Sequence, residues 1–156
     1  MSRNHPTIDP NIAAEIEACS YLSLRELREP KDNAVTLVLD EAIIGANATN
    51  LTLGDITLNE VRNIEVTRNS RAFELLWDQY VAYSVRNESF SLPGKDEEIA
   101  SGHWLRIYRK SHFLDYLNKA TWGDACHPGP VTHFGIICLN HVIDVASVKP
   151  PKIRLL

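Results

Sequence analysis

The chain has 156 residues, of which 44% are apolar, and 16 basic and 20 acidic side chains give it a net charge of −4. A chain of this length can bury about 70% of its unfolded surface, so it needs no metal ion or disulfide to fold. Its composition excludes a disordered chain, and no apolar run approaches the roughly 20 residues that span a bilayer.

The first predicted element is a helix over about 10–20. Asp9 can cap its first turn, and Pro10 is tolerated at the first helical position, where the missing N–H has no helical partner. Apolar residues then follow at helical spacing. The next segment, 21–29, is ambiguous between helix and strand.

Strand patterns follow. Residues 34–40 alternate and are rich in β-branched types, which predicts a strand. The stretch 45–54, GANATNLTLG, is small and polar, as is typical of a surface loop. Ile64 and Val66 indicate a further short strand.

Residues 72–85 fit two structures. Their large apolar residues include a set at helical spacing, yet the runs 73–77 and 81–85 each alternate, with Asp78-Gln79 between them as a turn. The enrichment in aromatic and β-branched residues favours a β-hairpin over a helix. The helix stays open as the alternative.

The last third of the chain contains three predicted elements. A strand covers 104–108, and Ser111 caps a helix over about 111–121 whose apolar residues form a stripe. Two glycines and two prolines make 122–130 a loop. Residues 131–145 are predicted to form one long central strand, because apolar residues occupy both faces.

Together these elements predict an α+β fold with a mostly antiparallel sheet. We expect a single globular domain over 1–156, with 1–8 as a loose N-terminal tail. No dinucleotide or Walker-type glycine loop occurs, so nothing in the sequence supports a nucleotide site.

Charge and cysteine usage bear on compartment and partners. The start of the chain lacks the apolar core of a signal peptide, and three cysteines, an odd number, favour reduced thiols. We therefore expect a cytoplasmic protein. Because nucleic-acid binding relies on a basic excess, the acidic balance favours a protein partner over nucleic acid.

Histidines and cysteines crowd the end of the chain. They are His103, His112, Cys126, His127, His133, Cys138 and His141. None has the close pair spacing of zinc sites, and on one strand His133 and His141 would lie about 26 Å apart. We predict no metal ion and no cofactor. What remains is the hypothesis of a metal- or cysteine-dependent enzyme, in which the Cys126/His127 loop acts with His103 or His112.

A different hypothesis rests on one strand face. Trp104, Arg106, Tyr108 and Lys110 alternate and would share that face. Tryptophan, tyrosine and arginine commonly anchor protein interfaces, although the pattern is also typical of an ordinary solvated strand. Our leading hypothesis is a non-enzymatic protein-interaction module of adaptor or immunity type that binds through these four residues. A homodimer formed through the strand near the C-terminus is a third hypothesis.

Overall fold

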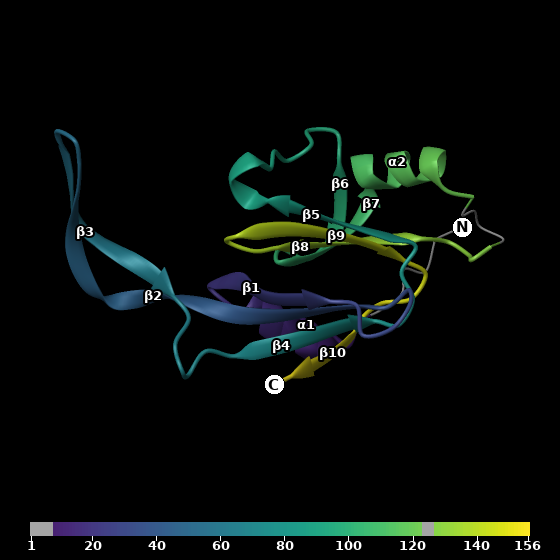
Figure 1. The fold of residues 1–156 in the computed structure, drawn as a ribbon, viewed down its shortest axis with the longest axis horizontal. Coiled ribbons are helices and arrows are strands. Elements are labelled where there is room, and N and C mark those ends of the chain that lie inside the picture. The colour runs from purple at the N-terminus through teal and green to yellow at the C-terminus, as the bar shows by residue number, and fades with distance from the viewer. Residues whose placement is uncertain (1–7, 123–126) are drawn as a thin grey trace.

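A computed structural model of the protein describes residues 8–122 and 127–156. The predicted tail, 1–8, therefore lies outside the described residues except for its last position. The described residues form two α-helices and ten strands arranged in two antiparallel five-stranded sheets (Figure 1). This confirms the α+β class. No helix in these two ranges is both long and apolar enough to cross a membrane.

The two sheets are stacked as layers (Figure 1). The first has the order β1–β2–β4–β10, with β3 paired to β2, and the second has the order β5–β9–β8–β7–β6. The strands of the first sheet are β1 (Tyr21–Arg28), β2 (Val35–Leu53), β3 (Ile56–Glu65), β4 (Ala72–Trp77) and β10 (Lys152–Leu155). Those of the second are β5 (Ala82–Asn87), β6 (Glu98–Ser101), β7 (Leu105–Lys110), β8 (Thr132–Ile137) and β9 (His141–Ser147).

The hydrophobic core lies between the sheets. Fully buried side chains of β2 and β4 meet those of β8 and β9 there, and Trp77 and Phe134 join the layers with ring centroids 5.8 Å apart. Aromatic pairs at such a distance add to the stability from buried area alone. The core therefore depends on both sheets being present.

Helix α1 (Pro10–Glu17) begins as predicted, since Asp9 accepts the Asn11 N–H at 2.9 Å, and it ends before residue 20. The Glu17 carboxylate accepts backbone N–H groups at the start of β7, including that of His103 at 2.8 Å and that of Leu105 at 3.1 Å. Glu17 thereby joins the helix of one layer to a strand of the other.

Helix α2 (His112–Ala120) matches the helix predicted over 111–121, and it lies on the outer face of the second sheet (Figure 1). The Ser111 hydroxyl caps it by accepting the Leu114 N–H at 3.1 Å. Leu117 is its buried residue, whereas Tyr116, one position away, is exposed.

The single long strand predicted over 131–145 is wrong. The segment is a hairpin in which β8 pairs with β9, and Ile137 faces Val142 across a turn. Asn140 fixes that turn against β1: its side chain accepts the Leu24 N–H and donates to the Leu24 carbonyl, both at 3.0 Å. Two paired strands bury apolar side chains on both faces as one strand would, so the pattern alone did not reveal the reversal.

The loop predicted over 45–54 is also wrong. Strand β2 continues to Leu53 and pairs with β3 through a tight turn at Gly54-Asp55. Gly54 has a φ of 59°, a left-handed conformation that suits glycine in a two-residue hairpin turn. The small polar residues of 45–54 thus belong to an exposed strand rather than to a loop.

Residues 72–85 contain the strands expected of a hairpin, which excludes the helix, but these strands do not pair with each other. Strand β4 lies between β2 and β10 in the first sheet, while β5 pairs with β9 in the second. Residues 78–81 carry the chain from one layer to the other. Alternation correctly predicted strands, and the partner of each was set by tertiary packing.

Candidate functional site

The four residues of the predicted binding face occupy β7 and the position before it, but they do not form one exposed surface. Tyr108 is buried. Trp104 is half-buried, and its indole N–H donates to the Cys19 carbonyl at 2.9 Å. Arg106 is also half-buried, so that only Lys110 is fully exposed. Tyr108 is therefore not on the exposed face that the alternation predicted, whereas binding through the other three residues stays a prediction.

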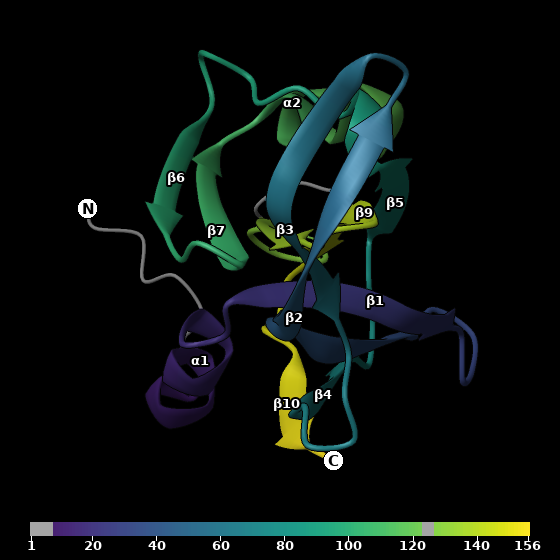
Figure 2. The same cartoon turned by 90° about the vertical axis from the view of Figure 1, so that its left-hand side faces the viewer.

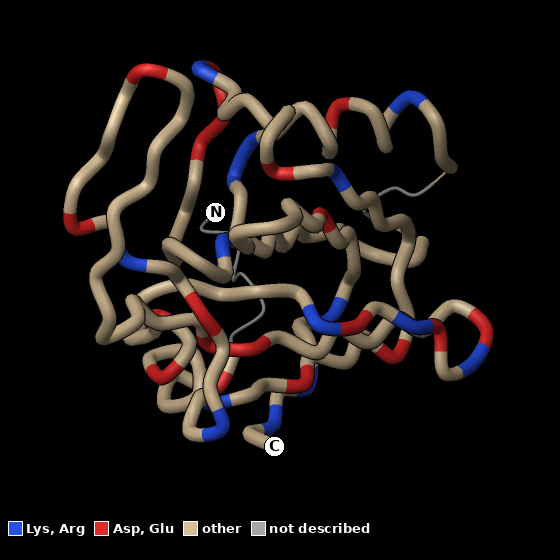
Figure 3. Tube along the Cα trace, turned by 60° about the vertical axis from the view of Figure 1, so that its left-hand side comes forward, with Lys and Arg blue, Asp and Glu red and all other residues tan. Residues whose placement is uncertain are grey.

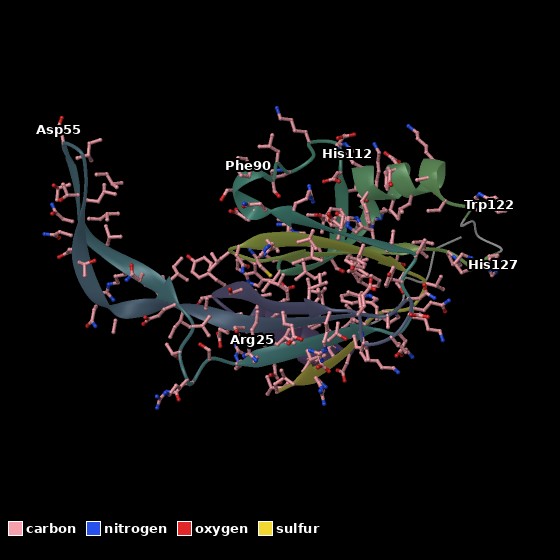
Figure 4. All side chains as sticks on the ribbon, viewed as in Figure 1. Arg25, Asp55, Phe90, His112, Trp122 and His127 are labelled. Carbon is pink, nitrogen blue, oxygen red and sulfur yellow. The ribbon has the colours of Figure 1, made fainter. Side chains whose placement is uncertain are left out.

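The residues of the enzyme hypothesis lie on separate elements. Exposed His112 approaches Asp96, with Nε2 2.8 Å from a carboxylate oxygen, and exposed His103 packs edge-on against Trp104. His127 follows the 123–126 segment, and Figure 4 shows it well separated from His112. Cys126 lies outside the described residues. In the part of the chain that the structure describes, no three histidine, cysteine, aspartate or glutamate side chains gather as metal ligands would.

The two described cysteines are buried thiols. Burial raises the pKa of Cys138 to about 12. It also raises the pKa of Cys19 to about 11, although the nearby Arg71 guanidinium acts in the opposite direction. Because the thiolate is the nucleophile, neither group is suited to covalent catalysis.

A buried Ser–His–Asp network lies between α2 and the second sheet. The Ser111 hydroxyl is 2.8 Å from Nδ1 of His133, and Nε2 of His133 is 3.0 Å from a carboxylate oxygen of Asp144. The Tyr108 ring stacks on the imidazole at 4.3 Å with an interplanar angle of 9°. Sequence reasoning missed this network because its members come from three separate segments.

The geometry of the network is structural rather than catalytic. In a serine hydrolase triad the serine hydroxyl bonds Nε2 and the carboxylate bonds Nδ1, whereas here the two ring nitrogens are exchanged. Ser111, His133 and Asp144 are all buried, and the Ser111 hydroxyl already caps α2. Satisfied buried networks of this kind fix one arrangement of a core.

The charge on Asp144 is held by its partners. Burial alone would raise its pKa, but the bond from His133, the Arg86 guanidinium at 3.0 Å and the Ser84 hydroxyl at 3.2 Å outweigh burial and lower that pKa. The carboxylate therefore links β9 to its neighbours β5 and β8.

A cleft of about 620 Å³ opens where the chain crosses between the two sheets. Its walls come from the β4–β5 and β9–β10 connections, from the turn before β2, and from the loop before β8. The residues that line it are Lys31, Asp78, Gln79, Tyr80, Val81, His127, Pro128, Ser147, Val148, Lys149, Pro150 and Lys152. His127, one of the residues singled out from the sequence, is thus at a concave surface.

The second exposed feature is the arm, which we define as the hairpin of residues 43–65 formed by the far half of β2 and by β3. Figure 1 shows it projecting beyond the two stacked layers, and in Figure 2 it rises in front of the second sheet. Only Asp55, Glu60, Arg62 and Glu65 carry charge in this range, so most of the arm is uncharged in Figure 3.

One face of the arm near its tip is apolar. Leu51 pairs with Leu58 and Leu53 with Ile56, and because side chains alternate along a strand, these four share a face. We call them the apolar strip. Their exposed fractions lie between 44% and 65%. The opposite face carries threonines, and alternation within β2 and β3 around the Gly-Asp turn was the sequence signal for this hairpin.

A second apolar patch lies at the same end of the molecule. Strand β5 is an edge of the second sheet and exposes Val85, and the segment after it exposes Phe90 and Leu92 at 84% and 85%. Figure 4 shows Phe90 at the end of the body that faces the arm. We call Val85, Phe90 and Leu92 the β5 patch.

In comparisons with known proteins, no family model, no curated protein and no solved structure matches the chain.

Proposed function

We propose that the chain is a non-enzymatic, cytoplasmic protein-interaction module that assembles with a second copy of itself by exchanging arms. The observation that carries the proposal is the apolar strip on a projecting hairpin. Exposed, flat, apolar strands promote uncontrolled pairing unless a partner covers them. A partner that covers the strip would prevent such pairing.

The second copy is the occupant that the surfaces favour. An exchange of arms about a two-fold axis needs two complementary patches on one chain, so that the first patch of each copy packs against the second patch of the other copy. The apolar strip supplies one, and the β5 patch, with the unpaired edge of β5, supplies the other. Both lie at one end of the molecule, so a single two-fold axis can bring both pairs together.

The exposed apolar area of the two patches is large enough for a dimer interface. If a fully exposed large apolar residue presents roughly 200 Å², the exposed fractions of the strip, Phe90 and Leu92 give each copy on the order of 750 Å². Specific interfaces bury about 800 Å² on each partner. The strip alone supplies little more than half of this, so the exchange must bury both patches to give a stable dimer.

The test is the mass of the protein in solution, measured by sedimentation equilibrium over a range of concentrations. The wild type should have the mass of two chains, and the variant Leu53→Asn/Ile56→Asn should have the mass of one. The matched control is Thr52→Asn/Thr57→Asn, which changes the opposite face of the same turn and should stay dimeric.

Phe90→Ser changes the receiving patch and should also give a single-chain mass. A wild type with single-chain mass at every concentration would refute the proposal. So would a strip variant that remains as dimeric as its control while keeping a cooperative unfolding transition.

A further inference from the structure

We infer that the cleft at the sheet junction is a binding site for a small polyanion, a ligand that carries clustered phosphate or carboxylate groups. This inference is independent of the arm, because none of the residues that line the cleft belongs to the arm or to the β5 patch.

The cleft concentrates positive charge in an acidic protein. Among the residues that the structure describes, Lys31, Lys149 and Lys152 line it together with the carboxylate of Asp78, whereas the whole chain has a net charge of −4. The bond from Lys152 lowers the pKa of Asp78, so Asp78 is ionised and cancels one of the three lysine charges. The described lining residues therefore carry a surplus of two positive charges in a concave site, where low-dielectric walls focus the field on an anion.

The lysines are available to a ligand. The Nζ atom of Lys31 lies 3.9 Å from a carboxylate oxygen of Asp78. The side chains of Lys31 and Lys152 are both mostly exposed. Such exposed ion pairs are weak and rearrange at little cost. Lys149 is exposed and forms no ion pair with any residue that the structure describes. Its charge acts on Asp78 without a direct bond, so its ammonium group is available to contact a bound anion.

The shape of the site fits a small molecule. Its volume of about 620 Å³ is within the range of roughly 300–1,000 Å³ that is usual for ligand sites. The apolar part of its wall consists of Tyr80, Val81, Val148 and Pro150. The lysine ammonium groups would orient an anionic ligand against this wall. The lysines come from the β1–β2 connection, from the β9–β10 connection and from the start of β10, which meet where the chain passes between the sheets.

The test is calorimetric titration of the full chain with two probes, pyrophosphate and citrate, at low and high salt. We expect saturable binding of at least one probe that weakens as salt rises. Lys149→Glu should weaken that binding by roughly tenfold or more, which is the effect of losing one charge-assisted contact. Preference for one probe assigns the ligand to the phosphate or to the carboxylate class.

The matched control is Lys95→Glu, which makes the same change of charge at an exposed lysine that does not line the cleft. It should leave the affinity within about twofold. The inference is overturned if neither probe binds saturably, or if both variants weaken binding equally, which would indicate only a general effect of net charge. Because both lysines are exposed, thermal unfolding should be unchanged in either variant and serves as the check on folding.

Discussion

Replacing Asp144 with alanine is predicted to destabilise the protein strongly, because the carboxylate serves three partners in a buried position. The change leaves Nε2 of His133 without its acceptor and removes the bonds from Ser84 and Arg86. Leaving that buried donor unsatisfied and losing the two other bonds to the carboxylate, one of them from a charged group, together cost about 3–5 kcal/mol. Since 1 kcal/mol shifts the Tm of a chain of this size by about 2–4 °C, the Tm should fall by roughly 6–20 °C.

Asp144→Asn is the matched variant. The amide oxygen can still accept from His133, but the amide NH2 replaces the oxygen that accepts from Ser84 and from half-exposed Arg86, so the expected loss is about 1–3 kcal/mol. Urea unfolding followed by tryptophan fluorescence measures the loss of unfolding free energy in both variants. Trp77 is buried in the core, so its fluorescence reports the exposure of the core to solvent.

The pH dependence follows from the lowered pKa of Asp144. A carboxyl group with a lower pKa in the folded state stabilises the protein above its unfolded pKa, about 4, and this contribution is lost as the pH falls through the folded value. The difference in stability between wild type and Asp144→Asn should therefore shrink on acidification. If Asp144→Ala were as stable as the wild type within about 1 kcal/mol, the network would not be the structural element described here.

Three further predictions concern the packing at Gly135, the bonds of Glu17 and the reactivity of the buried thiols. In Gly135→Ala, the new Cβ would lie 2.7 Å from the buried Tyr108 ring, so urea unfolding should show a loss of about 1–3 kcal/mol, and an unchanged midpoint would contradict the close approach. Glu17→Ala leaves backbone N–H groups at the start of β7 without their acceptor. It should cost about 1–3 kcal/mol in the same assay, and Glu17→Gln, which keeps one acceptor oxygen, should cost less. Cys19 and Cys138 should react with a disulfide reagent only after unfolding, because burial raises both pKa values; rapid labelling of either in the native protein, located by mass spectrometry, would show that the thiol is accessible.

Helix caps and strands were predicted correctly where the residues that determine them lie within one short segment. Asp9 and Ser111 were identified as helix caps because a cap depends on residues within one turn, and both make the expected bonds. Alternation likewise predicted strands at 34–40 and within 72–85.

Features that depend on distant partners were not predictable in the same way. Which strands pair is decided by packing between layers, so β4 and β5 resembled a hairpin although they belong to different sheets. The turn at Asn140 is held by a strand more than a hundred residues earlier. Only the arm was predictable in principle, since Leu51 and Leu53 alternate before Gly54-Asp55 as a hairpin requires.

The most direct test of arm exchange is a photo-crosslink from the apolar strip. A photoreactive phenylalanine analogue placed at position 53 in isotopically light protein, mixed with heavy protein, should form light–heavy dimers on irradiation. Mass spectrometry should map the attachment to residues 82–92 of the second chain, around the β5 patch. Crosslinks confined to a single chain, or attachment to the second chain elsewhere than 82–92, would contradict the exchange of arms.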